Sequence, residues 1–136
     1  MRIESRARAR ALQAVYAWDL RGEQDLERVS SQIWDDLLVS AEERKLASML
    51  LRTLLQDGKS LDKLLAEVTT NWRIERLGAI DRSVLRLAAA ELHRGETPPR
   101  VVIREAIRLA ERYGSPESAR FVNGVLDGLA RRMGRL

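Results

Sequence analysis

Apolar residues recur along most of this chain at intervals of three and four residues, which is the spacing of one face of an α-helix. Over residues 4–20 this pattern predicts a first helix. Arg6, Arg10 and Gln13 fall on its polar side. Its apolar arc contains Ala7, Ala11, Ala14, Val15 and Trp18.

The same periodicity predicts further helices over about 25–39, 41–57, 61–68, 80–92, 98–113 and 116–130, with a single helical turn over 72–77. Capping residues and prolines precede several of these segments, and a glycine ends most of them. We therefore expect an all-α, compact bundle of about seven helices in one domain over residues 1–136. Gly58 divides it into two packed helical subdomains, at about 1–58 and 59–136.

The length and composition of the chain exclude several classes of functional site. The chain has 136 residues, no cysteine and a single histidine, His93. Thiolate metal sites, disulfides and cysteine nucleophiles are excluded, and we expect no metal site and no cofactor. No stretch approaches the roughly 18 apolar residues of a membrane span, and no signal segment is recognised, so we expect a cytoplasmic protein without a membrane partner.

Catalysis finds little support in the sequence. The adjacent acidic pairs Asp35-Asp36 and Glu42-Glu43 would point about 100° apart on a helix and could not share a substrate. They are better interpreted as a solvated face and a helix start, where acidic residues favour the helix dipole. We predict that the protein is not an enzyme.

Charge is distributed unevenly along the chain. Residues 1–21 carry a net charge of +3, residues 22–81 carry −4 and residues 82–136 carry +5. If the two basic ends meet in space, they form a positive face suited to phosphate groups. The alternative is that the arginines are simply spread over solvated helix faces.

The first helix concentrates candidate RNA contacts. Arg6, Arg8 and Arg10 supply planar guanidinium groups that bind phosphate and stack on bases, and Tyr16 follows at the edge of the apolar arc. Arg6 and Arg10 lie one turn apart, so they repel each other unless an anion lies between them. Tyr16 fits equally well as a stacking platform for an unpaired base and as an ordinary core aromatic.

A second unusual segment is Asn123-Gly124, in the middle of the last predicted helix. Glycine at such a position costs about 1 kcal/mol relative to alanine. Close helix packing over Gly124, or a bond from the Asn123 side chain to backbone or ligand, would offset that cost. Of these, packing is favoured.

The C-terminal half resembles the NusB family of transcription antitermination factors. The resemblance rests on the stretches 80–87 (IDRSVLRL), 91–92 (EL), 99–107 (PRVVIREAI) and 121–127 (FVNGVLD). Arg6-Ala7-Arg8 and the stretch 13–16 (QAVY) are similar to the family's opening helix, so the resemblance covers essentially the whole chain. Departures from the family's pattern fall at Glu4, Ser5, Ala90 and Arg104.

The resemblance implies an all-helical fold of two subdomains that binds single-stranded boxA-type leader RNA together with NusE, a ribosomal small-subunit protein. It implies transcription regulation by read-through of ribosomal RNA operons, in a larger complex with NusA, NusG and RNA polymerase. Some ribosomal RNA methyltransferases begin with a similar domain, but no cofactor-binding domain is expected here. Whether the chain is a monomer or a homodimer stays open, and a helical protein–protein interaction module without RNA binding is the alternative function.

The family's functional positions can be carried over residue by residue. Arg6, Arg8 and Tyr16 match its RNA-contacting first helix, with Arg10 as a further cation. At the start of the last helix, the matching RNA-binding residues are Glu117, Arg120, Phe121 and Asn123. Glu75 and Asp81 fall on acidic positions that face NusE in the family.

Overall fold

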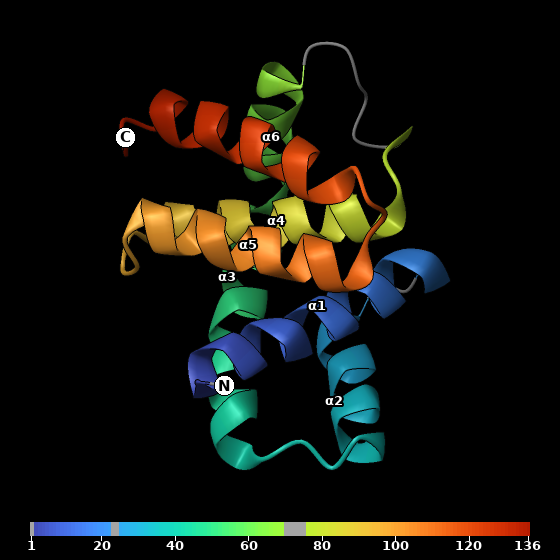
Figure 1. The fold of residues 1–136 in the computed structure, drawn as a ribbon. Helices are drawn as coiled ribbons and strands as arrows, with labels where there is room; N and C mark the ends of the chain where they lie inside the picture. The colour runs from blue at the N-terminus through green and yellow to red at the C-terminus, as the bar shows by residue number, and fades with distance from the viewer. Residues whose placement is uncertain (1, 23–24, 70–75) are drawn as a thin grey trace.

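The computed structural model describes residues 2–22, 25–69 and 76–136, and these ranges are helical, without a strand (Figure 1). The fold class predicted from the periodicity is thereby confirmed. None of the described helices has the length and apolar character needed to cross a membrane. The helices are α1 (Ile3–Arg21), α2 (Leu26–Asp36), α3 (Ala41–Val68), α4 (Ala79–Arg94), α5 (Pro99–Tyr113) and α6 (Ser118–Arg132).

Helix α4 forms the centre of the bundle, because α1, α3, α5 and α6 all pack against it. Its run of three alanines, Ala88–Ala90, is buried together with Leu85 and Leu92. Short alanine side chains allow neighbouring helices to approach closely on several sides while the leucines fill the remaining space. The core of the described chain is continuous around this helix.

The described part of the chain contains six helices, one fewer than expected, because Gly58 does not end a helix. Instead α3 continues through it to Val68. Leu54, Leu61 and Leu65 are buried on either side, so tertiary packing holds the glycine in a helical conformation. The expected division near residue 58 thus falls inside α3, and the turn expected over 72–77 lies mostly outside the described residues.

Replacing Gly58 with alanine should therefore stabilise the protein. A Cβ atom at this position would meet only the Leu54 Cδ1 atom, at the ordinary contact distance of 3.8 Å. The substitution reduces the conformational freedom of the unfolded chain, so the free energy of unfolding should rise by about 0.5–1 kcal/mol. Urea denaturation measures this change, and a lower unfolding free energy would contradict the continuous helix.

Helix α5 lies between α1 and α6 on one side of the molecule (Figure 1). On its α1 side, the Ser5 hydroxyl donates a hydrogen bond to the Glu105 carboxylate. On the other side α5 packs along α6. The helices at the two basic ends of the chain, α1 and α6, therefore lie on either side of α5.

Candidate nucleic-acid interface

Arg6 and Arg10 share one carboxylate, that of Glu43 at the start of α3. The Glu43 Oε1 atom lies 3.8 Å from Arg6 Nε and 3.3 Å from Arg10 Nε. This anion relieves the repulsion expected between the two guanidinium groups. The Arg6 side chain is nevertheless 45% exposed and that of Arg10 27%, so part of each cation faces solvent.

Glu43 is placed there by the first turn of α3. The Ser40 side chain accepts a hydrogen bond from the Glu43 backbone N–H at 3.2 Å and donates one to the Glu43 carboxylate at 2.8 Å. This hydroxyl bond is the main cause that lowers the pKa of Glu43; burial acts in the opposite direction, and Arg10 and Arg6 add to the lowering. Glu43 therefore remains ionised and competes with any external anion for the two arginines.

Substituting Glu43 with glutamine should lower the free energy of unfolding at neutral pH by about 1 kcal/mol, since charge-assisted bonds are lost. A lowered folded-state pKa stabilises the folded chain above the ordinary pKa of 4.5, and this contribution disappears as pH falls through the folded value. The stability difference between wild type and variant should therefore shrink below about pH 4.5. Urea titrations at several pH values measure it, and a difference independent of pH would contradict this role.

Arg8 points inward, unlike Arg6 and Arg10, because residues two apart on a helix face different directions. Its guanidinium, 13% exposed, donates to Glu91 of α4 at 2.9 and 2.5 Å and to Glu105 of α5 at 3.1 Å. Burial alone would lower the pKa of Arg8, but the bonds and attraction to these carboxylates raise it overall. Arg8 thus joins three helices, a placement that differs from the phosphate contact expected from the sequence.

Tyr16 lies two to three turns further along α1 than Arg6 and Arg8, and it is partly exposed. It lies roughly 80° around the helix axis from Arg6, as ten residues of helix require. Trp18 packs against the hydrophobic core, as expected for a core aromatic. An aromatic ring on the same helix as an exposed cation can stack on an unpaired base.

The turn before α6 positions the second group of predicted RNA contacts. Ser118 is buried, and its hydroxyl accepts a hydrogen bond from the Ser115 backbone N–H at 2.9 Å. A Cβ atom on Gly114 would lie 2.5 Å from this hydroxyl, so glycine is required for the close approach. The helix therefore starts at Ser118, two residues later than the sequence predicted.

Three of the predicted residues at this end of α6 are placed as follows. Glu117 and Arg120 are exposed, whereas Phe121 is partly buried and packs against the core. Within the ranges that the structure describes, the Arg120 guanidinium has no ion-pair partner. An exposed cation and a partly buried aromatic residue thus occupy consecutive positions of α6.

Asn123 and Gly124 are both exposed, and the expectation that helices pack closely over Gly124 is wrong. A Cβ atom at Gly124 would have no neighbour within 4 Å. The Asn123 side chain makes no hydrogen bond to any described residue. Among the described residues, neither packing nor a side-chain bond therefore offsets the cost of this pair.

Sequence reasoning missed a row of exposed arginines on the outer face of α5. Its members are Arg100, Arg104, Arg108 and Arg112, which we call the arginine ridge. Their strict spacing of four residues was the signal that could have revealed them. The ridge lies between α1 and α6, so it connects the two basic ends of the chain.

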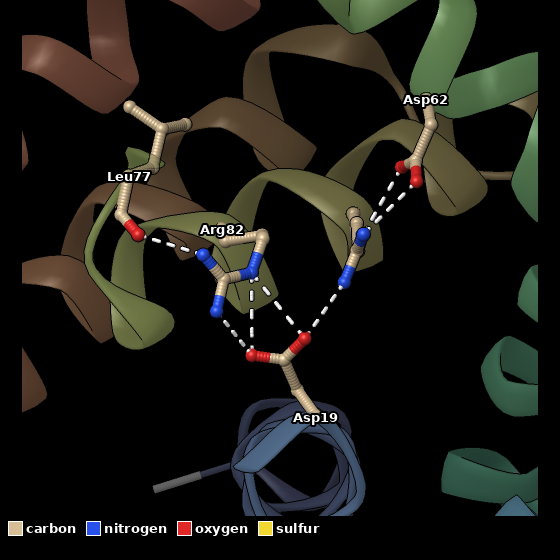
Figure 2. Close-up of polar contacts among 5 residues, drawn as sticks. Asp19, Asp62, Leu77 and Arg82 are labelled. Atoms are coloured by element: carbon tan, nitrogen blue, oxygen red, sulfur yellow. Dashed lines mark hydrogen bonds and ion pairs between the residues drawn. The ribbon is translucent and has the colours of Figure 1, made fainter. Parts of the chain in front are cut away.

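Of the two predicted partner contacts, Glu75 lies outside the described residues, and Asp81 is partly exposed in the first turn of α4. The Asp19 carboxylate anchors this end of α4, because it accepts from Arg82 Nε at 3.2 Å (Figure 2) and from Arg86 Nη1 at 3.1 Å. Arg86 also donates twice to Asp62, at 3.1 and 3.0 Å. The network ties α4 to α1 and α3 and fixes the helix turn that carries Asp81.

The site thus consists of exposed and partly exposed cations, an exposed amide and partly exposed aromatic rings, a combination suited to binding a polyanion. Comparison with known proteins agrees with this chemistry. A protein-family model described as "NusB family" matches residues 5–131 of this chain. The transcription antitermination protein NusB of Anaeromyxobacter dehalogenans is 45% identical over 127 residues, which cover 93% of this chain and 89% of that protein.

Two solved structures share the fold. NusB of T. maritima aligns with a TM-score of 0.87 and 33% identity, over 94% of this chain and 90% of that one. A chain from the crystal structure of antitermination factors NusB and NusE in complex with double-stranded RNA aligns with a TM-score of 0.88 and 28% identity, over 97% and 98%. With a family model spanning nearly all of its helices and a relative of this identity, the chain belongs to the NusB family.

Proposed function

We propose that this protein is a transcription antitermination factor that binds boxA-type single-stranded leader RNA together with NusE and promotes read-through of ribosomal RNA operons. The observation that carries the proposal is the similarity over nearly the whole chain to a NusB that was solved with NusE and RNA. The exposed cations on α1 and α6 support it independently, because they supply the electrostatic footprint that RNA requires.

Different residues of the chain make different contacts with the RNA. Arg6 and Arg10, with Arg120 on α6, neutralise phosphates, and Tyr16 and Phe121 stack on unpaired bases. The exposed amide of Asn123 can donate to and accept from a base edge or a phosphate. Arg8 acts behind this surface as a positioning residue, since its bonds to Glu91 and Glu105 fix α1 against α4 and α5.

NusE binding is assigned to a separate surface around Asp81; Glu75, the second residue expected to face NusE, lies outside the described residues. The Asp81 carboxylate makes no hydrogen bond to another residue of the described ranges, and it is partly exposed. NusA, NusG and RNA polymerase belong to the larger complex that this proposal implies. RNA and protein surfaces that are separate allow the chain to act as an adaptor without catalytic chemistry.

Replacing both Arg6 and Arg10 with alanine should weaken RNA binding and leave NusE binding unchanged. If about four phosphates are neutralised, the log–log salt slope for single-stranded RNA is about −3, and losing two contacts should bring it to about −1.5. Fluorescence anisotropy at several salt concentrations measures the slope. Loss of NusE binding in the same variant would mean that the two arginines determine folding rather than RNA binding.

The adaptor function is tested by RNA binding with and without NusE. A boxA-type oligoribonucleotide should bind more tightly in the presence of NusE, and a scrambled oligomer should not show this gain. Equal binding of the two oligomers, or none, would instead favour a helical protein–protein interaction module. Size-exclusion chromatography of the chain alone, and then with NusE or RNA, shows whether it forms a homodimer and whether that homodimer competes with either partner.

A further inference from the structure

The arginine ridge is an unusual feature of this surface. Its four guanidinium groups follow one another at intervals of four residues, about 6 Å along the helix axis, so the row extends over about 18 Å. Successive members are shifted by about 40° around α5, which turns the row from the α6 side at Arg100 to the α1 side at Arg112. Like charges at this spacing destabilise a helix.

The protein itself does little to neutralise the ridge. Arg108 lies 3.4 Å from Glu105, but that carboxylate is already shared with Arg8 and Ser5. Arg112 lies over the ring of Tyr113, at 5.1 Å from the ring centre, and has no ion-pair partner among the described residues. For Arg100 and Arg104, no carboxylate of the described ranges lies within ion-pair distance. Elsewhere, arginines such as Arg82 and Arg86 are held by buried or half-buried acids.

The ridge also borders an open groove of about 550 Å³ between α5 and α6. Arg100, Arg104 and Arg108 line one wall, and Asn123 and Arg131 line the other. Asp127, on the same wall, is paired with Arg131 at 2.9 Å, so Glu111 is the acidic lining residue without an arginine partner of its own. At its other end the ridge reaches α1, because Arg108 and Arg112 border a small cleft with Ser5 and Ala9.

We propose that the arginine ridge and this groove bind the sugar–phosphate backbone of RNA irrespective of its sequence. Charge complementarity favours a polyanion, and the regular row of forked donors suits successive phosphates of one extended strand. That this strand is the continuation of the RNA bound by α1 and α6 rests on the function proposed above. Asn123 would then lie where the RNA-binding surface of α1 and α6 meets the arginine ridge.

The test compares two probes: a boxA-type oligoribonucleotide, and the same oligomer extended by a run of uridines. At low salt the extension should tighten binding to the wild-type chain roughly tenfold. Arg104→Glu with Arg108→Glu should abolish this gain while changing binding of the short oligomer less than about twofold, since neither residue belongs to the α1 and α6 contacts. The matched control is Arg52→Glu with Lys59→Glu, which changes the net charge equally at exposed positions of α3.

The ridge variant should also reduce the salt slope for the extended probe by about 1.4, the value for two phosphate contacts to a single strand. A gain that survives in the ridge variant, or is lost equally in the α3 control, would overturn the proposal; the first result would assign the ridge to an acidic protein surface. Oligouridine alone separates the two proposals. Suppose that the wild-type chain binds oligouridine but not the boxA-type oligomer, and that the ridge variant no longer binds oligouridine. The proposed function then fails, while the proposal for the arginine ridge stands.

Discussion

Replacing Arg8 with methionine should lower the free energy of unfolding by about 3 kcal/mol. Methionine keeps much of the apolar stem but removes the cation that Glu91 and Glu105 share, and leaves Glu105 with the exposed Arg108 at 3.4 Å. The side chains of Glu91 and Glu105 are only 10% and 8% exposed, so water cannot replace the lost partner effectively. Circular dichroism should record a melting temperature lower by roughly 10 °C.

Two further variants isolate the cause. Arg10→Met removes a more exposed arginine from the same helix and should cost less than about 1 kcal/mol. Adding Glu91→Gln and Glu105→Gln to Arg8→Met removes the stranded charges and should restore most of the lost stability. A loss below about 1 kcal/mol for Arg8→Met alone would mean that solvent screens the network. RNA binding by the folded variant should change little, which separates a positioning role from direct contact.

The comparison of sequence and structure is most instructive at Gly58 and Gly124. Local propensity predicted a helix end at Gly58, but buried leucines on both sides carry α3 through it. At Gly124, close packing was expected to offset the cost of glycine, yet a Cβ atom there would have no neighbour within 4 Å. At both positions the local rule described the intrinsic cost of glycine correctly, but whether packing offsets that cost depends on the tertiary fold, which the sequence does not show.

The arginines show a similar limit. The apolar periodicity of α1 correctly separated Arg6 and Arg10 from the buried arc, because it depends only on position along one helix. The partners of Arg8 are 83 and 97 residues away in the chain, so its inward role depends on tertiary packing. The arginine ridge was visible as a spacing of four, but its place between two basic helices required the fold.

Replacing Tyr16 with alanine should weaken binding of single-stranded boxA-type RNA by about tenfold or more, since stacking of one base on an aromatic ring contributes about 1–3 kcal/mol. Tyr16 is partly exposed on α1, and its hydroxyl makes no hydrogen bond within the described chain, so the ring rather than the hydroxyl should be the functional group. Tyr16→Phe should therefore bind RNA nearly as well as the wild type.

Two measurements distinguish this role from that of an ordinary core aromatic. A base in a duplex is already stacked, so Tyr16→Ala should affect binding of a paired RNA of the same sequence much less. Urea denaturation gives the cost of the substitution to folding, which should be small for a ring that is partly solvent-exposed. If the variant loses stability but binds the single strand within about twofold of wild type, Tyr16 belongs to the core, and base stacking on this surface would fall to Phe121.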